Sequence, residues 1–175
     1  MVAVVSVCVA CPSGGGTGTG SNTGGGGNSN LTSGRAPDFA LDDLDGNEYR
    51  LAEHTGEGVI LLNFWATWCG PCQEEMPHLD RIQQEYREQG LQILCISMDG
   101  PETVSRVRSH VGRHNFSFTV LLDVESEVTQ LYNPRSAAPF NALIDREGNI
   151  VWSHEGYAAG DEEELEQEIR SALGL

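Results

Sequence analysis

Two cysteines separated by two residues, Cys69 and Cys72, are the residues of this chain best suited to do chemistry. They follow the apolar run 59–62 and precede a helix-like stretch, so they lie where a buried strand leads into a helix. A helix N-terminus has unpaired N–H groups and a partial positive charge, and both favour a thiolate at the first cysteine. With this spacing the two thiols can form a disulfide and reopen it without moving the rest of the chain. The pattern therefore predicts a redox site.

The same spacing could supply half of a tetrahedral zinc site, a structural disulfide or a pair of inert thiols. A zinc site needs a second pair, but Cys95 stands alone, and Cys8 and Cys11 lie in an N-terminal apolar segment. An inert pair is disfavoured because Trp68 places an apolar surface beside the first thiol and Pro71 fits only the first turn of a helix. We therefore expect neither a metal nor a cofactor at this site.

The elements that must position the two thiols alternate between strands and helices. An Asp45-Gly46 turn between alternating apolar residues predicts an N-terminal hairpin at the edge of a sheet. The expected strands are 59–64, 91–98, 118–122, 140–144 and 150–153, and the expected helices are 71–89, one from Pro101 onward, 125–132 and one from Asp161. We expect the Asp161 side chain to cap that last helix together with Glu164. This order implies a mixed α/β sheet covered by helices on both faces.

Three segments carry a resemblance to a known family: 63–72 (NFWATWCGPC), 36–41 (APDFAL) and 138–145 (APFNALID). In this order they resemble the TlpA/ResA-like thiol-disulfide oxidoreductases, and the N-terminal half is also similar to the AhpC/TSA redoxins. The resemblance covers residues 35–175. It implies a thioredoxin-like fold with an N-terminal β-hairpin extension, acting on protein thiols and disulfides.

The positions of the thiols suggest their roles. Cys69 is expected to be the exposed nucleophile with a depressed pKa, and Cys72, one turn deeper, is expected to resolve the mixed disulfide. Trp68, Gly70 and Pro71 would contact the substrate, and the Gly-Pro pair would also tune the redox potential. The same dipeptide occurs in thioredoxin, which favours a reductase over an oxidase.

The resemblance implies two further site residues. Pro139 would be a cis-proline facing the disulfide, and the backbone of Ala138 before it would pair with an extended substrate. Asn63 stands where thioredoxin has a buried Asp, and the ResA-like pattern instead places a glutamate at Glu75. This glutamate would be a proton relay if burial raises its pKa, or a solvated acid that complements the helix dipole, like Glu74. Helical periodicity alone does not decide between the two.

The net charge of −16, with no basic run, argues against nucleic acid and against electrostatic docking on anionic lipid. His110 and His114 are four residues apart, as metal ligands on a helix can be, but no third ligand is in view, and we expect them at a solvated helix end. Cys95, between apolar neighbours, is expected to fill the core.

The N-terminus predicts export and attachment. Residues 1–11 contain an apolar run too short to span a bilayer, typical of an export signal, and Val9-Ala10-Cys11 resembles the end of a bacterial lipobox. Residues 12–34 are almost all Gly, Ser, Thr and Asn and predict a flexible linker. We expect a lipid anchor at Cys11, a membrane-tethered lipoprotein on the periplasmic side of a bacterial cell envelope, and an upstream membrane thiol as electron donor.

The main hypothesis is a reductase of protein disulfides, and two alternatives remain. A peroxiredoxin-like peroxidase would place Thr or Ser three residues before the reactive cysteine, where this chain has Ala66. A copper-binding chaperone would hold Cu(I) between the two thiols, with His154 or Met98 as an added ligand if folding brings one of them close.

Overall fold

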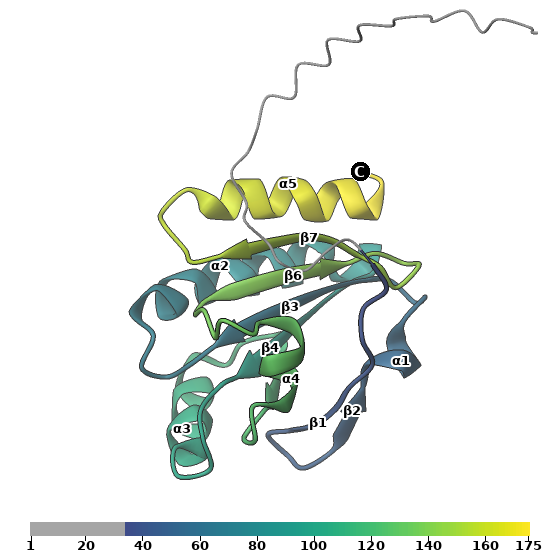
Figure 1. Cartoon of the computed structure of the whole chain (residues 1–175). Coiled ribbons are helices and arrows are strands. Elements are labelled where there is room, and N and C mark those ends of the chain that lie inside the picture. The colour runs from purple at the N-terminus through teal and green to yellow at the C-terminus, as the bar shows by residue number, and fades with distance from the viewer. Residues whose placement is uncertain (1–33) are drawn as a thin grey trace, which may run out of the picture.

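A seven-stranded mixed sheet organises the molecule, with the strand order β2-β1-β5-β4-β3-β6-β7 (Figure 1). The structure, a computed structural model, describes residues 34–175. The strands are β1 (Ala40–Asp43), β2 (Glu48–Arg50), β3 (Val59–Trp65), β4 (Leu91–Ser97), β5 (Thr119–Leu122), β6 (Phe140–Ile144) and β7 (Ile150–Glu155). The helices are α1 (Leu51–His54), α2 (Gly70–Tyr86), α3 (Val104–His114), α4 (Glu127–Tyr132) and α5 (Asp161–Leu173), and a 3-10 turn, η1 (Arg87–Gln89), follows α2.

The centre of the sheet is β3, in which every residue is buried. It pairs in parallel with β4 and antiparallel with β6, and β4 pairs in parallel with β5. A strand buried on both faces is expected to be continuously apolar, and β3 is, except at Asn63. Because β3 and β4 run in the same direction, their carboxyl ends meet at one edge of the sheet, where α2 begins. That edge is where sites form in open α/β sheets.

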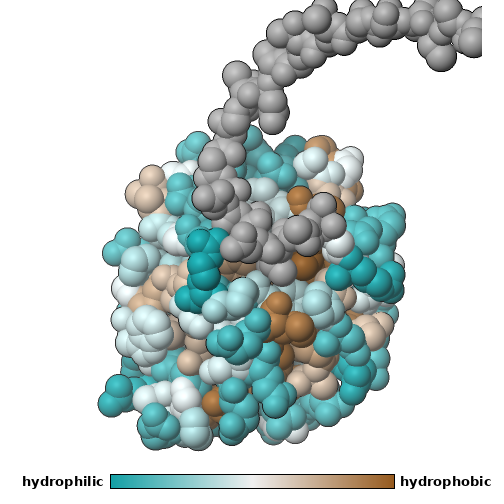
Figure 2. All heavy atoms as spheres, viewed as in Figure 1, coloured by the Kyte–Doolittle hydropathy of each residue, from teal (hydrophilic) through white to brown (hydrophobic). Residues whose placement is uncertain are grey.

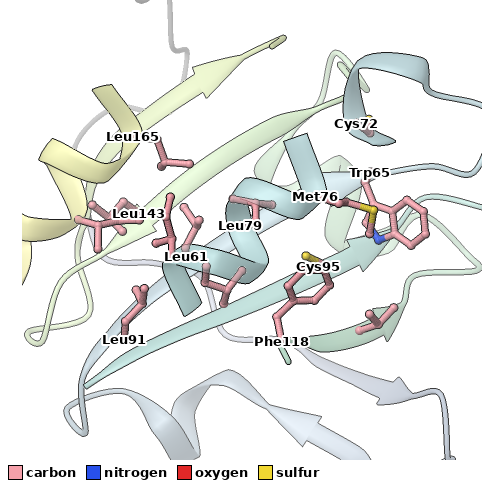
Figure 3. Close-up of a cluster of buried hydrophobic side chains, with 14 of the residues drawn as sticks. Leu61, Trp65, Cys72, Met76, Leu79, Leu91, Cys95, Phe118, Leu143 and Leu165 are labelled. Atoms are coloured by element: carbon pink, nitrogen blue, oxygen red, sulfur yellow. The ribbon is translucent and has the colours of Figure 1, made fainter. Parts of the chain in front are cut away.

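Helices cover both faces of the sheet. One apolar cluster joins one face to α2, α3 and α5, and in Figure 3 Leu79 of α2 and Leu165 of α5 extend toward Leu61 and Leu143 of the sheet. A second cluster on the other face contains residues of α1 and α4, among them Leu51 and Val128. The outer surface in the view of Figure 2 is mostly hydrophilic, with hydrophobic residues in small separate groups. Residues of β3 pack in both clusters, which fixes the position of the strand and of the turn that follows it.

The predicted hairpin forms and extends the sheet. The Asp43 carboxylate accepts hydrogen bonds from the backbone N–H groups of Asp45 (2.8 Å) and Asn47 (2.9 Å). Gly46 has a φ of 86°, a left-handed conformation that glycine adopts readily. β1 pairs with β2 and, antiparallel, with β5. The hairpin therefore forms one edge of the sheet, as the sequence predicts.

Two local predictions were wrong, and one short element was missed. The helix expected from Pro101 begins at Val104, because Thr103 N–H closes a turn onto the carbonyl of Gly100 first. Asp161 does not cap α5: its carboxylate accepts a hydrogen bond from Ala158 N–H in the preceding loop, and the N-cap residue is Gly160. The short helix α1 was not predicted at all, since four residues carry too little helical periodicity to detect.

The predicted export segment, residues 1–11, lies outside the described residues, as does the predicted linker 12–34 except for Gly34. Between residues 34 and 175, no helix has both the length and the apolar character needed to cross a bilayer.

Candidate redox site

Cys69 and Cys72 form a disulfide at the start of α2. The two sulfur atoms are 2.04 Å apart, and the Cα atoms are 5.3 Å apart. Cys69 is the N-cap residue of α2, and its Sγ accepts a hydrogen bond from the backbone N–H of Cys72 at 3.2 Å. Pro71 lies in the first turn, where its missing N–H leaves no helical hydrogen bond unmade. The helix therefore begins at the disulfide, with an N–H group directed at the first sulfur.

Cys69 is less exposed than the sequence predicts. Both cysteines are buried, with exposed fractions of 4% for Cys69 and 1% for Cys72, while Trp68 beside them is 67% exposed. In the oxidised pair each sulfur covers part of the other, which lowers the exposure of both. Cys69 remains the more accessible of the two, and Trp68 is a large apolar surface next to it.

Asp99 fastens the turn that carries the disulfide. Its carboxylate accepts hydrogen bonds from the backbone N–H of Thr67 at 2.8 Å and from the Thr67 hydroxyl at 2.6 Å. The hydroxyl of Ser97, the last residue of β4, also donates to it, at 3.1 Å. Asp99 is only 2% exposed. The sequence analysis missed this residue, although an acid directly after a buried strand signals a side chain near the carboxyl edge of the sheet.

Glu75 lies inside the protein in a cluster of amides. It is 3% exposed, whereas Glu74 beside it is exposed. The Nδ2 atom of Asn63 on β3 donates to one carboxylate oxygen at 2.9 Å, and Nδ2 of Asn141 on β6 donates to the other at 2.7 Å. The same Asn63 amide also donates to Oδ1 of Asn141 at 2.9 Å. Burial thus favours the relay interpretation of Glu75 over a solvated acid.

The burial of Glu75 governs its ionisation. Desolvation raises its pKa from the ordinary 4.5 to about 7, against the two amide hydrogen bonds, which lower it, and the Asp161 charge adds a smaller increase. Within the described residues, the Oδ1 atom of Asn63 is buried without a hydrogen-bond partner. A carboxyl with this pKa exchanges its proton near neutral pH, as a proton relay requires.

The peptide bond between Ala138 and Pro139 is cis, as the family resemblance implies. Ala138 packs against the apolar cluster that contains both disulfide cysteines, and β6 begins at the next residue after Pro139. The carbonyl of Pro139 accepts a hydrogen bond from Gly156 N–H at 2.8 Å, which ties this segment to the end of β7. Ala138 thus contacts the same apolar cluster as the two disulfide cysteines.

Comparison with known proteins identifies the family. The family described as Redoxin matches residues 32–169. The chain belongs to the redoxin family. Among curated relatives, the redoxin is 38% identical over 115 residues to thiol-disulfide oxidoreductase ResA of Geobacillus kaustophilus, a match that covers 66% of this chain and 64% of the relative.

Solved structures confirm the thioredoxin-like fold of this redoxin. A crystal structure from Chlorobium tepidum, provisionally named thiol:disulfide interchange protein DsbE, superposes with a TM-score of 0.75 at 34% identity, over 81% of this chain and 97% of that one. The exposed lipoprotein thioredoxin of Streptococcus pneumoniae superposes with a TM-score of 0.66 at 27% identity, over 77% of this chain and 99% of that one. The predicted resemblance to ResA-like proteins is therefore confirmed.

Other candidate residues of the redoxin have structural roles. Cys95 is fully buried in the core, as predicted. His110 is 9% exposed and packs on Trp65 with ring centroids 5.4 Å apart, so the prediction of a solvated position was wrong for it. Among residues 34–175, no group of three or more His, Cys, Asp or Glu side chains is arranged to hold a metal ion.

Proposed function

We propose that this redoxin is a thiol-disulfide oxidoreductase that reduces disulfides of protein substrates. The reduced Cys69 thiolate attacks a substrate disulfide, forming a mixed disulfide with one substrate sulfur and releasing the other as a thiolate. The Cys72 thiolate then attacks Cys69 Sγ, forming the observed disulfide and releasing the second substrate sulfur. The substrate gains two electrons and the dithiol loses two, so a thiol donor must reduce the pair again. The observation that carries this proposal is the Cys69–Cys72 disulfide at the N-cap of α2.

The hydrogen bond at the N-cap supports Cys69 as the nucleophile. The N–H of Cys72 already donates to Cys69 Sγ in the disulfide, and a negatively charged sulfur at the same place would be a stronger acceptor. The partial positive charge at the start of α2 acts in the same direction. Both effects favour the thiolate that the first step needs.

Glu75 would receive the proton of Cys72 in the second step. The two residues are three positions apart in α2 and share a face of the helix. With its pKa raised to about 7, Glu75 is partly ionised at neutral pH and can accept a proton. We expect release of the mixed disulfide to accelerate as pH rises through about 7, and Glu75→Gln to remove this step from the pH–rate profile.

Substrate would dock between Trp68 and the Ala138–Pro139 segment. Trp68 offers an exposed apolar surface next to Cys69, and Gly70 and Pro71 place no large side chain over the disulfide. The backbone groups of Ala138 make no hydrogen bond to other residues in the 34–175 range. They are therefore available to an extended peptide.

Trapping the mixed disulfide tests the proposal. The reduced protein is mixed with a disulfide-containing peptide, and covalent adducts are measured by mass spectrometry. Cys72→Ser should accumulate an adduct through Cys69, and Cys69→Ser should not. Cys95→Ser, which removes a thiol from the core, is the matched control and should turn over peptide like the parent. An adduct that forms equally through either cysteine, or no turnover by the parent, would refute the assignment.

The direction of the reaction needs a separate measurement. Equilibration of the Cys69–Cys72 pair with glutathione gives its potential, and a reductase should lie near that of thioredoxin, about −270 mV. A value close to about −120 mV would instead indicate an oxidase.

We also propose that the protein acts in the cell envelope as a tethered lipoprotein. The support is the lipobox-like Val9-Ala10-Cys11 and the similarity to an exposed lipoprotein thioredoxin. Labelled palmitate fed to cells should enter the full-length chain, and Cys11→Ser should abolish the label. Cys8→Leu, which introduces the aliphatic residue usual at this position of a lipobox, should keep the label. Label that persists in Cys11→Ser would exclude Cys11 as the site of lipid attachment.

No observation favours either alternative function. Ala66, three residues before Cys69, is fully buried and has no hydroxyl to bind a peroxide. His154, considered as a copper ligand, instead lies 3.5 Å from the carboxylate of Asp161.

A further inference from the structure

A hollow of about 410 Å³ lies beside the disulfide turn, between that turn and α3. The turn contributes Thr67 and Trp68 to its lining, and α2 contributes Gln73. The lining on α3 includes Arg106, Ser109 and Arg113. Gln73 donates through Nε2 to the carbonyl of Thr67 at 2.8 Å, so this wall is fixed to the turn. The hollow is thus lined by Trp68, the residue directly before Cys69 in the chain.

The charge of the hollow is opposite to that of the protein. The formal net charge of the chain is −16, yet α3 contains three arginines, two histidines and no acid. Arg106 and Arg113 are both exposed and have no ion-pair partner within residues 34–175. They are seven residues apart, two turns of helix, which places them on one face.

Helix stability alone does not explain both arginines. Arg113 lies in the last turn of α3, where a cation complements the helix dipole. Arg106 lies in the first turn, where a cation is unfavourable, and no acid occupies that turn to offset it. A positive charge at this end of the helix therefore suggests a ligand.

Two acids lie near the hollow, and within residues 34–175 neither forms an ion pair with Arg106 or Arg113. Asp99 contributes both oxygens to hydrogen bonds with Thr67 and Ser97 and is buried. Glu102 is exposed on the loop before α3, near Gly100, and does not line the hollow. The pKa of His110, the remaining ionisable group in the lining, is lowered by burial and by nearby His114 and Arg113, against Asp99, which raises it.

We propose that this hollow binds acidic side chains of the substrate polypeptide, on the segment that flanks the disulfide under attack. Arg106 and Arg113 are about 10 Å apart along the helix axis, given the rise of about 1.5 Å per residue. An extended peptide covers that distance in about three residues. The two guanidinium groups therefore match two acidic residues spaced about three positions apart. This inference rests on the proposed function and adds a substrate preference to it.

The overall charge makes the preference local. A protein this acidic repels an acidic peptide at long range, so such a peptide gains only where it meets the arginines. An acidic peptide that binds elsewhere on the surface is repelled by the negative charge of the protein. The preference should also weaken with added salt, as contacts between exposed charges do.

Matched peptides test the inference. Each carries one cysteine as a mixed disulfide with 2-thiopyridine, flanked by two Asp residues three positions apart or by Asn at the same places. Release of 2-thiopyridone by the reduced full-length protein, with no other thiol in solution, gives the second-order rate constant for each peptide. The parent should prefer the Asp peptide, Arg106→Gln or Arg113→Gln should reduce that preference by up to about fivefold, and the double variant by up to about thirtyfold.

The control variant is Arg87→Gln, which removes one positive charge in η1, beyond the far end of α2. It should leave the preference unchanged, and the Asn peptide should react alike with all variants, which shows that they are folded. Equal rates for the two peptides with the parent, or an unchanged preference in the double variant, would overturn the inference and leave the oxidoreductase function standing. No release from any peptide would overturn both.

Discussion

Replacing Glu75 with glutamine should change how the stability of the protein depends on pH. The folded protein holds the pKa of this carboxyl at about 7, against an ordinary value of 4.5. Below pH 4.5 the carboxyl is protonated in both the folded and the unfolded chain, so it does not make the free energy of unfolding depend on pH. Between pH 4.5 and about 7 the unfolded chain loses the proton while the folded chain keeps it. The free energy of unfolding therefore falls across this interval as pH rises and is level above it.

The size of this loss follows from the two pKa values. Each pKa unit corresponds to about 1.4 kcal/mol, so a difference of about 2.5 corresponds to roughly 3 kcal/mol. Glutamine does not ionise, so Glu75→Gln should lack this loss. Its amide faces the donors of Asn63 and Asn141 and adds a cost, but that cost is the same at every pH.

Urea unfolding of the oxidised protein, measured from pH 4.5 to pH 7.5, provides the assay. The difference in unfolding free energy between parent and variant should shift by about 3 kcal/mol in favour of the variant across this interval. Glu74→Gln, at the exposed neighbouring position, should run parallel to the parent. Parallel curves for parent and Glu75→Gln would show that the carboxyl titrates normally and would remove the basis for its role as a relay.

Two further predictions concern the framework of the site. Gly58→Ala should destabilise the protein by roughly 1–3 kcal/mol in urea unfolding, because the added methyl group would overlap the carbonyl oxygen of Gly90. Gly112→Ala is the control: no atom lies within 4 Å of its added methyl group, so it should be neutral or stabilising by up to about 1 kcal/mol. A tolerated Gly58→Ala would contradict this. Asp99→Asn should cost about 2 kcal/mol, because an amide cannot accept every hydrogen bond that the carboxylate accepts, and should speed hydrogen exchange at the N–H of Thr67. Unchanged exchange there would show that Asp99 does not fasten the turn.

Local patterns predict the elements around the site well. The strand before the disulfide and the helix after it follow from a buried apolar run, a proline in the first turn and the helical spacing of Met76, Leu79 and Ile82. The hairpin follows from Asp45-Gly46, since a left-handed glycine in a tight turn is a local property.

Contacts between distant residues could not be predicted in the same way. The cluster that buries Glu75 joins it to residues 12 and 66 positions away, and the Asp99 contact to Thr67 spans 32 positions. Periodicity placed Glu75 on α2 but did not show that two strands contribute amides to it. His110 was misjudged for the same reason: the ring that covers it, Trp65, comes from β3.

The hairpin at the outer side of the sheet also affects how molecules meet in solution. An edge strand has unpaired backbone groups that can recruit a strand from another molecule. Without the hairpin, that edge would be β5, which is largely apolar. The hairpin instead ends the sheet with β2, only three residues long, two of them charged. Two copies that approach along this side find little to pair with, so the hairpin protects the chain from aggregation.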